Sequence, residues 1–160
     1  HALSVVNDWI NRDWCCGFNI WQDVIKGLPY KVVGDTPGLS KPAASTEELV
    51  ATYQNSRIFL NTSTISPVPT ALLEAMSCGC AVVSTETCMI PEIIKNEENG
   101  FMSNDPQKLK QYVIDLLNDE DLAKEMGKKA RETILEKFTL DSFTKTWNKV
   151  FGMTSNLIVW

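Results

Sequence analysis

Residues 66–85, which read SPVPTALLEAMSCGCAVVST, decide the fold that the sequence predicts. The pair Ser66-Pro67 is typical of a helix start, because proline lacks the N–H group that would have no partner in a first turn. The helix is expected to end at Gly79, since glycine accepts the left-handed conformation that closes many helices. Residues 80–84 then read as a strand of small and β-branched residues. The stretch predicts a helix followed at once by a buried strand.

Strands and helices alternate outward from this unit. Further strands are expected at residues 3–6, 30–33, 57–60 and 101–102, and further helices at 17–28, 45–55 and from 91. Three consecutive amphipathic helices follow, at residues 106–118, 120–138 and 140–151. This alternation predicts one α/β domain over residues 1–160, a Rossmann-like parallel sheet with helices on both faces and a C-terminal helical tail.

The bulk properties narrow the function classes. The chain has 160 residues, 44% of them hydrophobic, and a formal net charge of −5, which argues against a nucleic-acid-binding surface. No apolar stretch approaches the roughly 20 residues that cross a bilayer. The sequence opens almost inside a strand, so we expect it to be a piece of a longer protein. The apolar residues 157–160 are expected to pack on something that this sequence lacks.

The five cysteines predict a compartment and argue against a metal site. An odd number without a secretory signal indicates reduced thiols and a cytoplasmic protein. Cys78 and Cys80 have the spacing of a metal-binding pair, but His1 is the only histidine and nothing else completes a tetrahedral ligand set. We therefore expect small buried thiols and no bound metal.

The candidate site lies where loops leave the carboxyl ends of parallel strands. The loop of residues 61–68 is rich in hydroxyl and amide side chains and leads into the predicted helix. The free amides of Val68, Thr70 and Ala71 at its mouth would hold a phosphate. Glu74 in the second turn would accept two hydrogen bonds from a vicinal diol such as a ribose. The structural alternative is a capping loop followed by a solvated glutamate; the G-x-G-x-x-G and Walker A sequences are absent.

The motifs of this region, in order, resemble a known family. Residues 71–85, then Ile90-Pro-Glu-Ile-Ile94 and Asn99-Gly-Phe101, are similar in order and spacing to the retaining GT-B glycosyltransferases of group 1 (GT4-like). The resemblance implies one half of a GT-B fold, the C-terminal domain that binds a nucleoside diphosphate sugar, with the N-terminal acceptor domain absent here. It implies transfer of the sugar to an acceptor hydroxyl with retention and without metal or cofactor. It also leaves room for an acceptor at the membrane periphery.

The resemblance assigns roles to single positions. Glu74 is the second glutamate of a Glu-x7-Glu motif and is implied to bind the donor ribose. The first glutamate, which contacts the transferred sugar in the family, is replaced by Ser66. The Gly-Phe-Gly segment that usually lies between them is Val68-Pro69 with its neighbours, while the amides of Thr70 and Ala71 remain for the diphosphate.

The cationic loop of the family is also altered. Its Arg and Lys follow the first strand and neutralise the diphosphate, but alignment on Gly17 puts Asn11 and Cys16 at those positions. Arg12, one residue away, is the expected phosphate partner, and Lys41 in the next loop is a weaker candidate. The structural alternative for Arg12 is a surface arginine paired with Asp8 or Asp13.

Three other functions remain open at this stage. Ser66 and Cys16 in place of charged residues favour a degenerate, binding-only module. A sugar-nucleotide epimerase of GT-B type would need catalytic carboxylates and a histidine. A flavodoxin-like signalling domain would need an acidic pocket, for which Asp8 and Asp13 are weak support, and would leave residues 74–92 unexplained.

Overall fold

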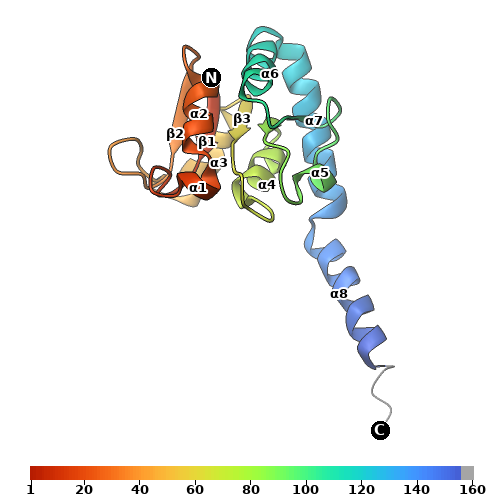
Figure 1. The fold of residues 1–160 in the computed structure, drawn as a ribbon. Coiled ribbons are helices and arrows are strands. Elements are labelled where there is room, and N and C mark those ends of the chain that lie inside the picture. Colours follow the sequence, from red (N-terminus) through yellow and green to blue (C-terminus); the bar gives the residue numbers. More distant parts are fainter. Residues whose placement is uncertain (156–160) are drawn as a thin grey trace.

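The computed structural model describes residues 1–155, and the apolar residues 157–160 lie outside that part. Its centre is a five-stranded parallel sheet with strand order β2-β1-β3-β4-β5 (Figure 1). The strands are β1 (Ala2–Val5), β2 (Tyr30–Val33), β3 (Ile58–Asn61), β4 (Ala81–Ser84) and β5 (Phe101–Met102). The predicted α/β fold is confirmed.

The helices cover both faces of the sheet. They are α1 (Asp13–Cys16), α2 (Phe18–Ile25), α3 (Thr46–Gln54), α4 (Thr70–Ser77), α5 (Ile90–Ile93), α6 (Pro106–Asn118), α7 (Glu120–Lys137) and α8 (Leu140–Ser155). One hydrophobic core packs α2 and α6 against one face, and a second packs α3, α4 and α5 against the other, with α7 joining both. Alternate residues of each strand point to opposite faces, which is why both β3 and β4 are buried along their whole length.

The strand order creates a topological switch point. The chain leaves β1 for β2 at one edge and returns to place β3 on the other side of β1. The connections after β1 and β3 therefore diverge to opposite faces of the sheet and leave a crevice at the carboxyl ends of these two strands. Open parallel sheets bind their ligands in such a crevice.

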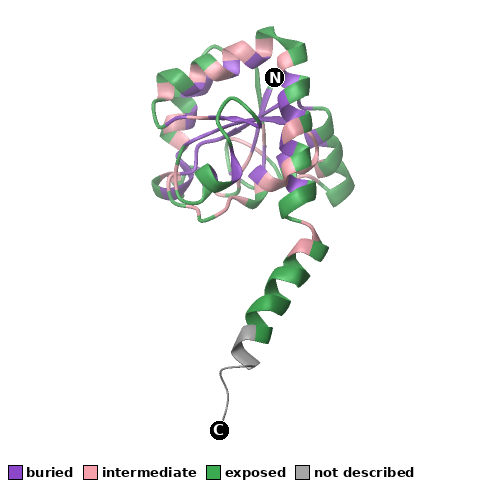
Figure 2. Ribbon diagram, turned by 90° about the vertical axis from the view of Figure 1, so that its right-hand side faces the viewer, coloured by how far each residue is buried: buried purple, intermediate pink, exposed green. Residues whose placement is uncertain are grey.

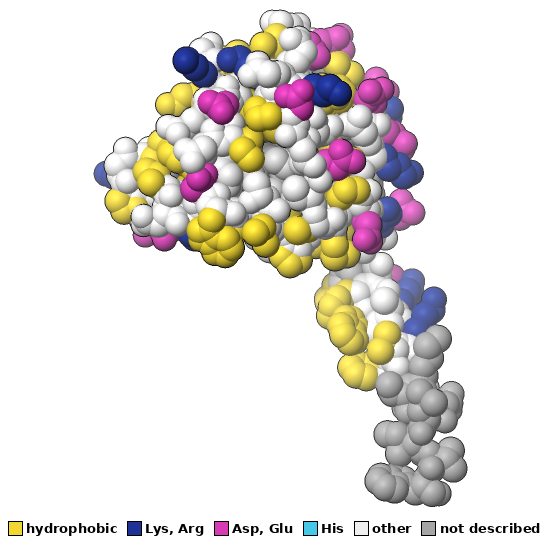
Figure 3. Space-filling view, viewed as in Figure 1, with side chains coloured by type: hydrophobic (Ala, Val, Ile, Leu, Met, Phe, Trp, Pro, Cys, Tyr) yellow, Lys and Arg dark blue, Asp and Glu magenta, His cyan; other side chains and the backbone are white. Residues whose placement is uncertain are grey.

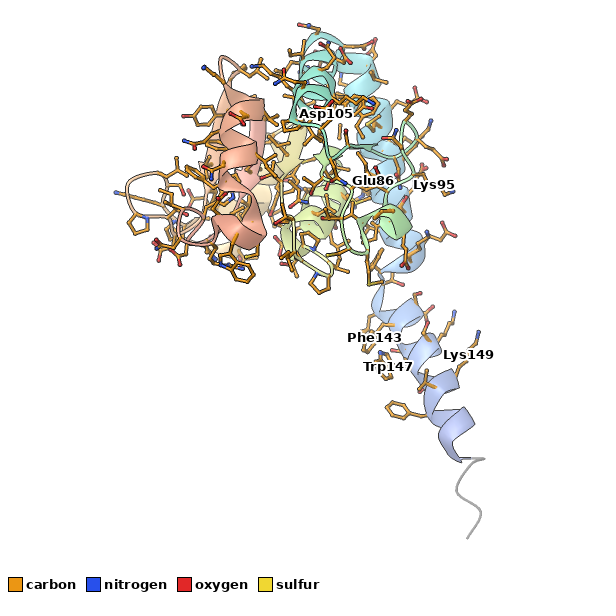
Figure 4. The ribbon with its side chains drawn as sticks, in the orientation of Figure 1. Glu86, Lys95, Asp105, Phe143, Trp147 and Lys149 are labelled. Atoms are coloured by element: carbon orange, nitrogen blue, oxygen red, sulfur yellow. The ribbon has the colours of Figure 1, made fainter. Side chains whose placement is uncertain are left out.

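The helix α8 extends away from the sheet (Figures 1 and 2). Its hydrophobic side chains gather along one side, where the rings of Phe143 and Trp147 are tilted against each other with centroids 6.0 Å apart, while Lys149 points to the other side (Figures 3 and 4). Both aromatic side chains are exposed. None of the helices in residues 1–155 is long and apolar enough to span a membrane.

Two local predictions have different outcomes. The helix expected over residues 45–55 is confirmed as α3, and Ser45 is its N-cap, whose hydroxyl accepts a hydrogen bond of 3.2 Å from the Glu48 amide. The short helix α1, Asp13–Cys16, lies between the predicted strand at residues 3–6 and the predicted helix at 17–28, where no helix was expected. Asp13 fixes this turn by accepting hydrogen bonds from the backbone and side-chain amides of Asn19. A helix of four residues is too short to show a periodic pattern.

Candidate functional site

A cavity of about 390 Å³ lies at the switch point, beyond the carboxyl ends of β1 and β3. It brings together all of the site residues predicted from the sequence, which are Arg12, Ser66, Val68, Thr70, Ala71 and Glu74. The rest of its lining consists of Val5, Val6, Asn7, Cys16, Leu49, Asn61, Ser63 and Pro69. The sequence thus located the cavity, although the ligand contacts of these residues stay a prediction.

The polar side chains at the strand ends form hydrogen bonds with other groups of the protein. Asn61, the last residue of β3, donates a hydrogen bond of 2.9 Å from its Nδ2 to Ser84 Oγ at the end of β4. The Ser63 hydroxyl donates to Asn61 Oδ1 over 2.9 Å. Asn7, after β1, accepts the amide of Asp35 at 2.8 Å. These side chains therefore hold the floor of the cavity in shape. Asn61 belongs to the polar loop of residues 61–68 that the sequence indicated. Asn7 was not singled out from the sequence, although a polar residue closing a buried strand was the available signal.

The loop after β3 is fastened to α1. The amide of Thr64 donates to the carbonyl of Cys15 over 2.9 Å, and its hydroxyl donates to the carbonyl of Trp14 over 3.1 Å. The Thr62 hydroxyl donates to the carbonyl of Gly17 over 2.8 Å. Gly17 has φ +63°, and a Cβ there would collide with the Thr62 carbonyl oxygen, so only glycine fits. The hydroxyls of Thr62 and Thr64 therefore fix backbone positions.

The helix α4 begins later than predicted. Its N-cap is Pro69, in an extended conformation with φ −65° and ψ 114°, so the predicted start at Ser66-Pro67 was wrong. The physical reason is that proline disfavours the helical conformation in the residue before it, and Val68 precedes Pro69. The Val68 amide accordingly lies outside the helix, although Val68 still lines the cavity. Thr70 and Ala71 are the first two helical residues, and their amides lie at the N-terminus that faces the cavity.

Arg12 contributes the cavity's positive charge. Its Nη1 lies 3.5 Å from the carbonyl oxygen of Asn7. Within residues 1–155 no carboxylate approaches the guanidinium to 4.0 Å, so the pairing with Asp8 or Asp13 is absent there. Asp8 accepts instead from Asn11 over 2.7 Å. Arg12 is therefore available to an anion, whereas Lys41 does not line the cavity.

Cys16 lines the cavity beside Arg12 as a neutral thiol. Burial, and next the hydrogen bond with the Cys15 thiol, raise the pKa of Cys16 to about 11. Cys15 and Cys80 are also buried, as expected, but Cys88 is exposed. In the part of the chain that the structure describes, no three His, Cys, Asp or Glu side chains gather in a way that could hold a metal ion.

Glu74 lies in the second turn of α4, as predicted, and has a partner that the sequence did not reveal. The hydroxyl of Tyr53, in α3, donates a hydrogen bond of 2.9 Å to Glu74 Oε2. Burial, and next this hydrogen bond, raise the pKa of Tyr53. The pairing depends on how α3 packs on α4, and no spacing within the sequence indicates it.

A second cavity of about 360 Å³ adjoins the first and shares Val5, Asn7 and Leu49 with it. Its other walls come from the end of β2 and the start of α3, and they consist of Val33, Gly34, Pro42, Ala43, Ser45 and Thr46. These walls are largely apolar, whereas the lining of the cavity around Arg12 is about equally polar and apolar.

Comparison with known proteins decides the family. The family model for glycosyl transferases group 1 matches residues 41–133, more than half of the chain. The chain belongs to this glycosyltransferase family. The match covers the motifs on which the resemblance was based and removes the reason to consider a flavodoxin-like signalling domain.

Individual glycosyltransferases agree with this assignment. N-acetyl-alpha-D-glucosaminyl L-malate synthase of Bacillus anthracis is 33% identical over 82 residues, which are 50% of this chain and 22% of that protein. The C-terminal domain of a group 1 glycosyltransferase, LpcC, from Francisella tularensis has a TM-score of 0.72 at 17% identity, over 88% of this chain and 87% of that one. HepE of Anabaena, solved in complex with UDP, has a TM-score of 0.80 at 16% identity, over 95% of this chain and 48% of that one. The chain spans between 22% and 29% of the length of the first curated relatives that it matches.

Proposed function

We propose that this chain is the donor-binding half of a glycosyltransferase that transfers a sugar from a nucleoside diphosphate to an acceptor hydroxyl with retained configuration. One observation carries the proposal: Arg12, the N-terminus of α4 and Glu74 line one cavity at the switch point of the sheet. A cation and free amides suit a diphosphate, and a carboxylate beyond them suits the adjoining ribose.

The diphosphate is the leaving group of this reaction, so its negative charge grows as the bond to the sugar breaks. Groups that are already aimed at that charge lower the barrier most. Arg12 supplies a full positive charge, and the amides of Thr70 and Ala71 add the positive end of the helix dipole. This arrangement supports departure of the diphosphate without a metal ion or cofactor.

The two cavities together suit the rest of a nucleotide. With the diphosphate at α4, Glu74 would accept hydrogen bonds from the ribose hydroxyls. The apolar second cavity, between β2 and α3, would take the flat base. Ser66 would face the sugar with a hydroxyl in place of a carboxylate, and Val68 would close the cavity beside it.

The remainder of the reaction is assigned to chain outside this sequence. The relatives are much longer, and a second domain there would bind the acceptor, including one at the membrane periphery, in a cytoplasmic enzyme. HepE is described in complex with UDP and matches this chain over 48% of its own length. We therefore expect the 160-residue chain to bind donor nucleotide and not to turn over. Measurable sugar transfer by this chain alone would contradict that expectation.

The test is calorimetric titration of the chain with UDP, GDP and ADP. One of the three is expected to bind, and Glu74→Ala should weaken that binding. Glu86→Ala, which removes an exposed carboxylate outside the cavity, is the matched control. Absence of binding to all three would favour the second candidate, a degenerate module, for which Ser66 and Cys16 in place of charged residues are the specific observations.

A further inference from the structure

The hydroxyl of Tyr53 and the carboxylate of Glu74 form the one hydrogen bond between side chains of α3 and α4 within residues 1–155. The two atoms are 2.9 Å apart. Glu74 is the only acidic side chain that lines the cavity, and Tyr53 itself is not part of the lining. The hydrogen bond therefore joins a residue of the protein interior to a residue of the cavity wall.

Tyr53 is a fixed donor. Only 1% of the residue is exposed, and its ring packs against Phe59 of β3 with centroids 5.9 Å apart. Its backbone is held as well, because the Cys80 thiol donates to the Tyr53 carbonyl over 3.2 Å. Leu72 and Met76 of α4 belong to the same buried core. The ring contact, the bond to the backbone and the shared core therefore hold the tyrosine in place.

Glu74 is exposed, so its side chain would sample several rotamers without a partner. In the described chain, Tyr53 is the one side-chain partner of its carboxylate, and it contacts Oε2 only. A carboxylate has two oxygens and about four acceptor directions. Oε1 and the remaining direction on Oε2 are consequently left for hydroxyl groups in the cavity.

The alternative is that Glu74 merely satisfies the hydroxyl of a buried tyrosine, since such hydroxyls usually have a partner. The two roles differ in what they affect. A structural hydrogen bond would affect every ligand of the cavity equally. A bond that orients Glu74 would affect only ligands whose hydroxyls meet that carboxylate.

We propose that Tyr53 is a positioning residue that holds the Glu74 carboxylate in the orientation that binds the ribose hydroxyls of the donor, and so favours ribonucleotides over deoxyribonucleotides. The inference rests on the proposed function. Because the carboxylate is ordered before the nucleotide arrives, less rotamer freedom is lost on binding.

The experiment is calorimetric titration of wild type, Tyr53→Phe, Glu74→Ala and the double variant with UDP and with 2′,3′-dideoxy-UDP, or with the corresponding ADP or GDP pair if that base binds instead. Tyr53→Phe should lower the affinity for UDP about three- to tenfold, the range of one hydrogen bond, and leave that for the dideoxy nucleotide unchanged. In the Glu74→Ala background it should change neither affinity. Tyr112→Phe removes a hydroxyl outside the cavity and serves as the control. Thermal unfolding verifies that each variant is folded.

The outcomes separate this inference from the function on which it rests. If wild type binds no nucleoside diphosphate, the proposed function fails and this inference fails with it. If wild type binds UDP but Tyr53→Phe weakens both nucleotides alike, or neither, only the positioning role is overturned. Selective weakening of UDP that disappears in the Glu74→Ala background establishes it.

Discussion

The Cα of Gly127 in α7 lies so close to the carbonyl oxygen of Gly79 that a Cβ on Gly127 would collide with that oxygen. Gly79 forms the turn between α4 and β4, so this approach packs α7 on the turn that ends the helix whose N-terminus faces the cavity. The contact involves backbone atoms, which cannot rotate away as a side chain can.

Gly127→Ala should therefore destabilise the protein. In an exposed helix the same change stabilises by about 0.5–1 kcal/mol, but here the overlap should cost about 1–3 kcal/mol. Urea unfolding followed by circular dichroism measures the difference. Gly152→Ala in α8, where a Cβ would meet nothing within 4 Å, is the matched control and should not lower the midpoint. Equal effects of the two substitutions would refute the packing argument.

Arg12→Gln tests the diphosphate contact. Its affinity for UDP should fall about tenfold, at the lower end of the range for hydrogen bonds to charged groups because Arg12 is exposed. Binding of uridine, which has no phosphate, should not change, and the salt dependence of UDP binding should become weaker. Calorimetry at two salt concentrations measures both effects. Lys41→Gln removes a cation outside the cavity and should behave as wild type.

The buried thiol of Cys80 should make stability fall at high pH. Burial raises its pKa from 9.0 to about 12 in the folded protein. Above pH 9 the unfolded state loses the proton while the folded state retains it, so the free energy of unfolding should decline between about pH 9 and 12. Urea midpoints at pH 8, 9.5 and 10.5 measure this decline, which should be shallower in Cys80→Ala.

Tyr53 contributes in the same direction, because its pKa is also raised, so part of the decline should persist in Cys80→Ala. The control Cys88→Ala removes an exposed thiol. A decline as shallow in Cys88→Ala as in Cys80→Ala would contradict the assignment to the buried thiol.

The exposed aromatic face of α8 should matter little to the stability of the sheet. Trp147→Ala is expected to change the free energy of unfolding by less than about 0.5 kcal/mol, because the side chain is exposed and α8 contacts mainly α7. Leu109→Ala in α6, which is fully buried, should cost about 2–5 kcal/mol. Chemical denaturation of both variants gives the comparison, and a large loss for Trp147→Ala would show that α8 belongs to the folded core.

Most of the fold could be predicted because its signals are local. The N-cap at Ser45 and the helix end near Gly79 follow from single residues and their conformational preferences. The predicted start of α4 was wrong because either Pro67 or Pro69 could mark the beginning of the helix. The effect of Pro69 on the conformation of Val68 decides between the two prolines. The helix α1 is stabilised by the hydrogen bonds between Asp13 and Asn19, which lies in the next helix. It is too short to show a periodic sequence pattern.

The sequence predicted where the candidate site lies, but it predicted fewer of the contacts between its residues. Residues that follow neighbouring parallel strands must converge, so Arg12 and Glu74 meet at one cavity. The partners of these residues come from other elements. The Tyr53 hydroxyl reaches Glu74 only because α3 packs on α4. The Thr64 hydroxyl donates its hydrogen bond to a backbone carbonyl of α1. Such pairings depend on tertiary packing and leave no spacing in the sequence.

The hydrogen bonds from Thr62 and Thr64 to the backbone of residues 14–17 have a consequence for motion. They join the element that carries Arg12 to the loop that leads into α4, so the two walls of the cavity are tied to each other through backbone carbonyls. We therefore expect these walls to move together when the cavity binds a ligand, and not toward each other.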